Sequence, residues 1–250
     1  NDPLSMSGSK TVSERNEIIK KVDKLIFISR WVKDRFFKGI NNNFLHKTKI
    51  IYHSVDIRKK TTKSNFIVFV GKLNYSKGYD IYKDAILKIL DKYANWKALS
   101  IGSESRRNIY IYHKQHKELG FINHKKTLEI LDKSEIAVVP SRWEEPFGRV
   151  ALEASACGCA TITSATGGLS ETNNYLININ KIDSEKLYNK INLLIQNKNK
   201  RKELQKLSRQ NIEHKISNNT NVIDLMRDSI FPKYQLNLLR KKLKIINLFN

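Results

Sequence analysis

A segment that combines carboxylates, a glycine and a helix start occupies residues 138–154. Glu145 precedes a helix that is predicted to begin at Gly148, and Glu153 lies inside that helix. The first amides of a helix attract anions, so a pyrophosphate could rest on the amides of Gly148 to Val150, between the two carboxylates. The carboxylates could then bind different parts of one ligand. The alternative is that Glu145 only balances the helix dipole and that Glu153 is an ordinary helix residue.

Alternating strands and helices are predicted around this segment. Short apolar runs predict strands at residues 66–70, 96–101, 118–122, 136–139, 160–163 and 175–179. Apolar residues at three- and four-residue spacing predict helices at residues 81–93, 127–132, 148–156 and 184–196. The alternation is typical of an α/β fold, here a Rossmann-like parallel sheet with flanking helices. Ligands of such sheets bind at the carboxyl ends of the strands, where Glu145 is predicted to lie.

The chain divides into three predicted parts. Residues 1–56 are predicted to be the end of an N-terminal domain with its linker, 57–200 the Rossmann-like domain, and 201–250 a basic helical segment. Because Asn1 is not a start methionine, we expect the natural protein to have a longer N-terminal domain. Within the first part we expect a helix at 11–22, a strand at 25–28, a helix capped by Ser29 that ends near Gly39, a polar loop at 41–49 and a strand at 49–52.

Composition and charge limit the classes of function. With 40% apolar residues and a mean hydropathy of −0.49, the 250-residue chain can form a hydrophobic core beneath a polar surface. No apolar run approaches the roughly 20 residues of a membrane-spanning helix, and no secretory leader is visible, so we predict a cytoplasmic protein. The net charge of +22 would attract nucleic acid, anionic lipid or phosphorylated substrates. The dispersed lysines are equally what AT-rich codon usage would give without selection for binding.

The histidines and cysteines do not form a metal-binding pattern. His113, His116 and His124 have no accompanying cysteines or acidic residues at ligand spacing, so we predict that they are surface residues. Cys157 and Cys159 lie at a helix-to-strand junction, where we expect them to pack.

An ordered set of motifs resembles one known family. The pattern Pro-Ser-x-x-x-Glu-x-Phe-Gly-x-x-x-x-Glu-Ala starts at Pro140 and is followed by Gly-Gly-Leu-Ser-Glu at residues 167–171. It resembles the donor-site signature of family 4 (group 1) retaining glycosyltransferases with the GT-B fold. Further similar motifs are Tyr52 to Asp56, Gly71-Lys72-Leu73, Lys77-Gly78 and Leu119 to Ile122. The resemblance implies that the chain holds mainly the C-terminal, donor-binding domain of such an enzyme.

The resemblance also implies roles for individual residues. Lys72 and Lys77 would hold the donor diphosphate, Glu145 would contact the transferred sugar as the catalytic residue, and Glu153 would bind the ribose hydroxyls. Two ammonium groups and a helix N-terminus could stabilise the leaving diphosphate, so no metal or other cofactor is expected. The alternative for the lysines is that they are two of many on the surface. The remaining expected donor-binding residues are Gly71, Ile122, Phe147, Gly148, Arg149 and Val150.

The sequence departs from the family pattern at several points. Lys72 stands where the family more often has Arg, which replaces a bidentate donor with a point charge. His53-Ser54 replaces the common Asn-Gly, and the segment after Glu171 lacks the usual glycine-containing turn. The N-terminal domain is nearly absent, so we expect that the chain alone does not complete a cleft.

The expected function is a retaining glycosyltransferase that transfers a sugar from a nucleotide sugar to a polysaccharide, glycolipid or similar acceptor, as in cell-envelope biosynthesis. The resemblance favours front-face attack, in which Glu145 orients and stabilises. The alternatives are a sugar phosphorylase or nucleotide-sugar epimerase on the GT-B frame, a non-catalytic donor-domain fragment, or a basic nucleic-acid-binding protein. We do not expect nucleic acid as a partner, because no known nucleic-acid-binding module is visible.

The last 18 residues, 233–250, predict a basic amphipathic helix. Its apolar stripe could pack across the domain boundary, or its basic face could bind an anionic membrane and place the enzyme beside a lipid-linked acceptor. The second interpretation predicts a peripheral location at the inner face of the membrane.

Overall fold

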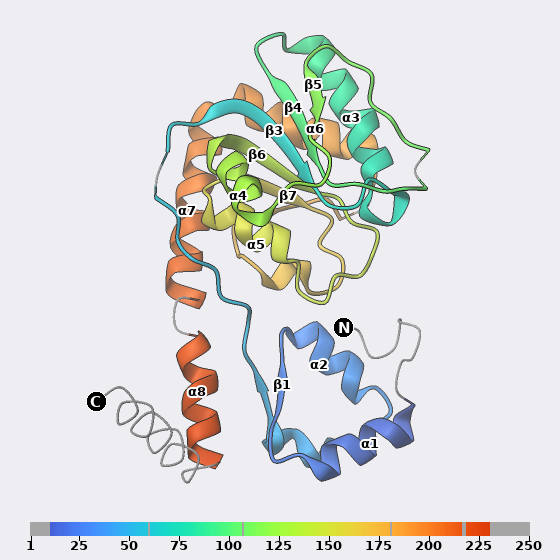
Figure 1. Ribbon diagram of the computed structural model, residues 1–250, viewed down its shortest axis with the longest axis vertical. Coiled ribbons are helices and arrows are strands. Elements are labelled where there is room, and N and C mark those ends of the chain that lie inside the picture. The colour runs from blue at the N-terminus through green and yellow to red at the C-terminus, as the bar shows by residue number, and fades with distance from the viewer. Residues whose placement is uncertain (1–10, 60, 107, 181, 217–218, 231–250) are drawn as a thin grey trace, which may run out of the picture.

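A six-stranded parallel sheet confirms the α/β prediction (Figure 1). The computed structural model describes residues 11–59, 61–106, 108–180, 182–216 and 219–230. The strand order is β5-β4-β3-β6-β7-β8, so the order reverses between β3 and β6, which pair directly. Such a reversal opens a crevice at the carboxyl ends of the two strands. The strands are β3 (Ser64–Val70), β4 (Lys97–Ile101), β5 (His116–Glu118), β6 (Ser134–Val139), β7 (Ala160–Thr163) and β8 (Ile177–Asn178).

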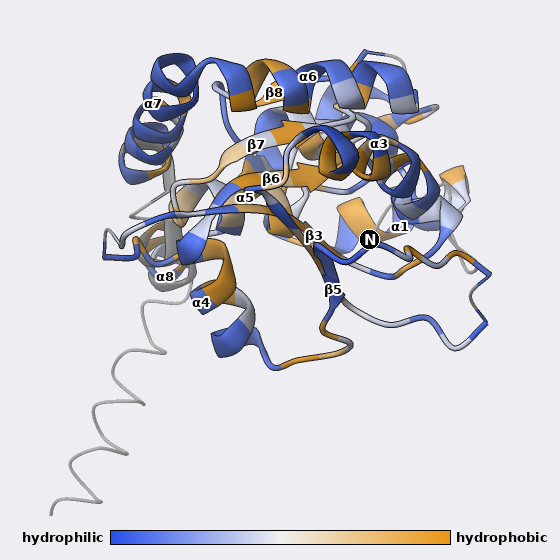
Figure 2. Cartoon of the chain, turned by 90° about the horizontal axis from the view of Figure 1, so that it is seen from above, coloured by the Kyte–Doolittle hydropathy of each residue, from blue (hydrophilic) through white to orange (hydrophobic). Residues whose placement is uncertain are grey.

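Helices cover both faces of the sheet, and the central strands are therefore apolar on both sides. α3 (Tyr79–Lys92) and α6 (Ser184–Gln196) pack on one face in a cluster with Ile67 and Ile136. α4 (His124–Lys133) and α5 (Arg149–Ala156) pack on the other face in a cluster with Val68. Every residue of β6 is buried, and Figure 2 shows β6 coloured as hydrophobic beneath hydrophilic outer helix surfaces. This burial on both faces is typical of parallel sheets.

Residues 11–51 form a small separate layer below the large sheet (Figure 1). Its elements are α1 (Val12–Lys21), β1 (Leu25–Phe27), α2 (Arg30–Phe37), the 3-10 helix η1 (Asn42–Lys47) and β2 (Thr48–Ile50). Ser29 caps α2 as predicted, since its side chain accepts from the amide of Val32. β1 and β2 pair in parallel, and the rings of Phe27, Phe36 and Phe37 pack together. Residues 52–59 and 61–63 lead on to the large sheet without helix or strand.

Three predicted elements differ most from the structure, and the ends of several others shift by one or two residues, as in β8, which was expected at 175–179 and lies at Ile177–Asn178. The strand that was expected at 118–122 is β5, which lies at His116–Glu118. It ends there because Gly120 adopts a φ of 65° and turns the chain away from the sheet edge. β5 lies at the edge of the sheet and its residues are polar. The sequence therefore has no apolar run that could mark this strand. The expected polar loop at 41–49 is mostly the 3-10 helix η1. α4 begins at His124, earlier than predicted, since Asn123 caps it through the amide of Lys126.

The C-terminal helices return to the large sheet and then leave it. α7 (Lys198–Ile216) packs against α5 and β7, and its buried Arg201 pairs with Glu135 at 3.1 Å. α8 (Asn219–Ile230) follows it. The predicted amphipathic helix at 233–250 lies outside the described residues, and the boundaries at 56 and 200 stay predictions. Within the described part of the chain, no helix combines the length and the apolar character that crossing a bilayer requires.

Candidate functional site

Two pockets adjoin at the end of β3, the small one on the side of β6 and the large one on the side of β4. They share Val70 and Gly71, the end of β3 and the residue after it. The small pocket has a volume of about 140 Å³ and is lined by Phe69, Val70, Gly71, Lys77, Val139, Ser141, Glu145, Gly148, Arg149 and Val150. The large pocket has a volume of about 530 Å³ and is lined by Val70, Gly71, Lys72, Ile101, Gly102, Ser103, Phe121, Ile122, His124, Thr127 and Glu153.

Lys77 reaches the small pocket from a short 3-10 turn, η2 (Tyr75–Lys77). The side chain of Asn74 caps this turn by accepting from the amide of Lys77 at 3.1 Å. Gly78 follows with a φ of 70°, and a Cβ there would lie 2.0 Å from the carbonyl oxygen of Pro140. Only glycine therefore allows the turn to approach the end of β6 so closely. The backbone thus fixes Lys77 beside the loop that carries Glu145.

Glu145 is held at both its side chain and its backbone. Its Oε1 lies 2.5 Å from the Lys77 ammonium and accepts from the Ser141 hydroxyl at 3.2 Å. Its carbonyl oxygen accepts from the amide of Gly168 at 2.6 Å. Gly167 and Glu145 also form an isolated parallel β-bridge. The side-chain contacts fix the carboxylate, and the backbone contacts fix the loop, at the wall of the small pocket.

The N-terminus of α5 borders the small pocket. Gly148 is its N-cap with a φ of 97° and makes no side-chain capping bond. Gly148, Arg149 and Val150 all line the pocket. The first amides of a helix have no intrahelical acceptor, so this end of α5 can stabilise an anion in the pocket.

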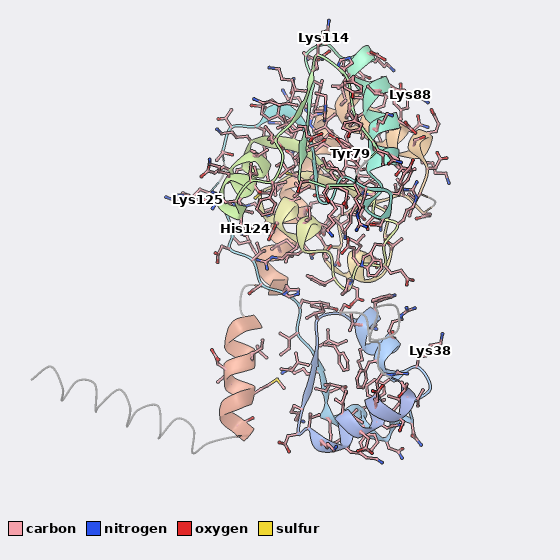
Figure 3. All side chains as sticks on the ribbon, turned by 45° about the vertical axis from the view of Figure 1, so that its right-hand side comes forward. Lys38, Tyr79, Lys88, Lys114, His124 and Lys125 are labelled. Carbon is pink, nitrogen blue, oxygen red and sulfur yellow. The ribbon has the colours of Figure 1, made fainter. Side chains whose placement is uncertain are left out.

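Glu153 lies on the next turn of α5 and lines the large pocket. It is only 6% exposed, and its Oε1 accepts from Nε of Arg149 at 2.8 Å. The Nε2 of His124 lies 3.0 Å from the same oxygen. His124 is exposed, as predicted for a surface residue, and lies at the start of α4 (Figure 3). Its contact with Glu153 was missed in the sequence, because 29 residues separate the two and only the packing of α4 on α5 brings them together.

The two lysines that the sequence groups together lie at different pockets. Lys77 lines the small pocket, whereas Lys72 is exposed and lines the large one. Ile122 lines the large pocket next to Phe121, a residue that is 84% exposed.

The side chain of Phe147 lies away from both pockets, against the expectation that it binds the donor. It is 2% exposed, and its ring stacks on Tyr52 with centroids 5.5 Å apart. His53 packs on the same ring. Burial and the nearby Arg149 charge lower the pKa of His53. Phe147 therefore packs the linker against the loop that carries Glu145.

The remaining histidines and the cysteines have packing roles. His113 and His116 are partly buried, which corrects their assignment to the surface. The Nε2 of His113 lies 3.4 Å from the Asp91 carboxylate, and the Nε2 of His116 lies 2.8 Å from the Ser100 hydroxyl. Cys157 and Cys159 are buried as expected, and burial raises the pKa of Cys159 to about 11, so neither is set up as a nucleophile. Among the described residues, no group of three His, Cys, Asp or Glu side chains is arranged to hold a metal ion.

A family model and two relatives match the large-sheet part of the chain. Residues 54–211 match the family described as glycosyl transferases group 1. An uncharacterised glycosyltransferase of Methanocaldococcus jannaschii is 37% identical over 180 residues, covering 62% of this chain and 45% of that protein. An uncharacterised 42.6 kDa protein in the cps region of Klebsiella pneumoniae is 30% identical over 174 residues, covering 64% of this chain and 43% of that protein. The chain thus spans less than half the length of these two relatives.

Solved structures show the same fold at low identity. HepE of Anabaena in complex with UDP superposes with a TM-score of 0.75 and 18% identity, covering 91% of this chain and 70% of that one. A glycosyltransferase of Rickettsia africae gives a TM-score of 0.74 and 17% identity, covering 89% of this chain and 68% of that one.

Proposed function

This chain belongs to the group 1 glycosyl transferases, and from that premise we propose that it is the donor-binding part of a glycosyltransferase that uses a nucleotide sugar and retains the configuration of the transferred sugar. One observation carries the proposal. Lys77, Glu145 and the N-terminus of α5 border one small pocket, and Glu153 lines the large pocket next to it. Such an arrangement suits a ligand with a sugar at one end, a diphosphate in the middle and a nucleoside at the other end.

In this proposal the diphosphate is stabilised by side chains and backbone amides. As the glycosidic bond breaks, the leaving nucleoside diphosphate gains negative charge. The Lys77 ammonium and the amides at Gly148 to Val150 would take up that charge at the small pocket, and Lys72 would approach from the large pocket. Because these groups are already placed, they need no reorganisation during the reaction. The proposed transfer therefore proceeds without a metal ion.

Glu145 would orient the transferred sugar. Its Oε1 is engaged by Lys77 and Ser141, which restrains the carboxylate and lowers its tendency to attack carbon. We propose front-face attack by the acceptor hydroxyl on the same side as the departing diphosphate, with Glu145 stabilising the positive charge that develops on the sugar ring. Glu153 would accept hydrogen bonds from the ribose hydroxyls in the large pocket.

The acceptor is proposed to be a polysaccharide or a lipid-linked glycan of the cell envelope. The Klebsiella relative is described as a protein of the cps region, which supports a role of this kind. We further propose that the enzyme is cytoplasmic and binds an anionic membrane surface through residues 233–250, which lie outside the described residues. Co-sedimentation of the full chain with anionic or neutral vesicles, compared with a chain that ends at Pro232, tests this; equal sedimentation of both chains refutes it.

Calorimetric titration and product analysis test the central proposal. HepE was solved with UDP and with UDP-glucose, so UDP is the first nucleotide to titrate, followed by GDP. Saturable binding of a nucleoside diphosphate and transfer from the matching nucleotide sugar are expected. Release of a sugar phosphate from a glycan would instead identify a phosphorylase, and conversion of the nucleotide sugar without transfer an epimerase. Binding to nucleic acid with steep salt dependence and no nucleotide saturation would identify a nucleic-acid-binding protein.

A further inference from the structure

Glu171 connects two parts of the chain that are far apart in the sequence. Its Oε2 accepts from the amide of Arg30 at 2.7 Å, and its Oε1 accepts from the amide of Trp31 at 2.8 Å. These are the first two residues of α2, whose amides have no acceptor inside the helix. The Tyr52 hydroxyl donates to Oε2 at 3.2 Å. Glu171 therefore caps a helix that begins about 140 residues earlier in the chain.

The short turn that ends at Glu171 also holds the loop that carries Glu145. This turn, η3 (Gly168–Glu171), begins with the amide that donates to the Glu145 carbonyl at 2.6 Å. A Cβ at Gly168 would lie 2.3 Å from the carbonyl oxygen of Pro146, so the turn and the loop are in direct contact. A displacement of η3 is thus transmitted to the backbone of Glu145.

A second contact runs from α2 to the same loop. Ser29, the N-cap of α2, is fully buried, and its hydroxyl donates to the Pro146 carbonyl at 2.5 Å. The Arg35 guanidinium on the next turn lies 3.6 Å from the Glu144 carboxylate. The first two turns of α2 therefore contact the residues on both sides of Glu145. Hydrogen bonds link α2, η3 and this loop in a closed ring.

We propose that Glu171 is a positioning residue that fixes the Glu145 loop by holding α2 against η3. The catalytic consequence rests on the proposed function, whereas the mechanical coupling between α2 and the loop does not. Glu171 lines neither pocket, so it acts through Glu145 and not through the ligand. Its negative charge also complements the helix dipole of α2. Glutamine at this position would offer one acceptor oxygen and turn an NH₂ group toward the second amide.

Hydrogen exchange measures the coupling directly. The test compares wild type, Glu171→Gln and a control, Glu185→Gln, which removes an exposed carboxylate paired with Lys88 at 2.6 Å. In Glu171→Gln we expect faster exchange both in residues 29–33 and in residues 144–148, and no change in either in Glu185→Gln. Faster exchange confined to residues 29–33, with residues 144–148 unchanged, overturns the proposal.

Kinetics of the full-length protein then test the catalytic consequence. Glu171→Gln should keep the wild-type affinity for UDP but lose about tenfold or more in kcat, because small displacements of a reacting group are costly. A residue that only stabilises the fold would lower the melting temperature and leave kcat unchanged in folded protein. Wild-type kcat, or a loss of UDP affinity as large as the loss of kcat, overturns the proposal. If the wild-type protein neither binds UDP or GDP nor transfers sugar, the proposed function fails, while the exchange experiment still decides the coupling.

Discussion

The ammonium group of Lys77 lies 2.5 Å from a carboxylate oxygen of Glu145, although 68 residues separate the two in the chain. The pair is placed by backbone contacts, since the amides of Arg142 and Trp143 both donate to the carbonyl of Ser76 at 2.9 Å. The bidentate pair of Arg142 and Asp80, a residue in the first turn of α3, adds a further link beside these contacts. A cation and an anion are thus held side by side at the wall of the small pocket, which is the preorganisation that charge stabilisation requires.

Replacing Lys77 by alanine should weaken binding of a nucleoside diphosphate by roughly 1 to 3 kcal/mol, the range of a charge-assisted contact. Lys72→Ala should weaken it less, because Lys72 is exposed and lines only the large pocket. Binding of the nucleoside should change little in either variant. Titration calorimetry measures both ligands, with Lys88→Ala as an exposed control. Equal losses for nucleoside and diphosphate would point to misfolding.

Glu145→Gln and Glu153→Gln should separate transfer from binding. Glu145→Gln should lower kcat strongly with little change in UDP affinity, because the carboxylate is proposed to act on the sugar. Glu153→Gln should weaken uridine and UDP alike, by roughly 1 to 3 kcal/mol for a lost bond to a charged group. Glu129→Gln, at an exposed position of α4, is the matched control. Wild-type affinity in Glu153→Gln would refute its ribose-binding role.

Chelation of divalent metals should leave nucleotide binding unchanged. The cationic side chains that line the two pockets, Lys72, Lys77 and Arg149, are supplied by the chain itself. Titration of UDP with EDTA and with added magnesium measures the effect. An affinity that falls in EDTA and returns with magnesium would contradict the metal-independent proposal.

Acidification should destabilise the fold partly through His116. Burial lowers the pKa of His116 below its usual 6.5 and outweighs the hydrogen bond with the Ile111 backbone and the charge of Glu118, which both raise it, while the charge of His113 lowers it further. Between the lowered native pKa and 6.5 the unfolded chain binds more protons, so the free energy of unfolding falls as the pH falls through that window. When the pH is lowered from about 7 to about 5, the free energy of unfolding of His116→Gln should therefore fall less than that of wild type. Urea unfolding at both pH values measures this difference; equal losses would contradict it.

Two glycines with left-handed backbones should differ in their response to alanine. At Gly148, a Cβ would lie 2.4 Å from Cδ2 of Leu169, whereas nothing lies within 4 Å of a Cβ at Gly120. Gly120→Ala should cost only backbone strain, about 1 to 2 kcal/mol. Gly148→Ala should cost more, about 2 to 5 kcal/mol, because overpacking adds to the strain. Similar unfolding free energies in urea would argue against steric conflict at Gly148.

Regular elements with strong local patterns were predictable. The strand at 160–163 and the helix at 184–196 have the predicted bounds, because an apolar run and a 3.6-residue apolar period are visible without any tertiary contact. The polar edge strand β5 was misplaced, because a strand that buries little has no apolar pattern. The cap at Ser29 was also readable, since capping depends on residues close in sequence.

The sequence by itself determined the α/β class, the family resemblance and the residue types available to the site, because these depend on spacing within short segments. The tertiary structure alone decided which of those residues meet. It separated Lys72 from Lys77, paired Lys77 with Glu145 and placed His124 against Glu153. It also buried Phe147 under Tyr52. These contacts depend on strand order, on close backbone approach at glycines and on helix packing, which are set by the burial of the whole core and leave no mark on the spacing of any one segment.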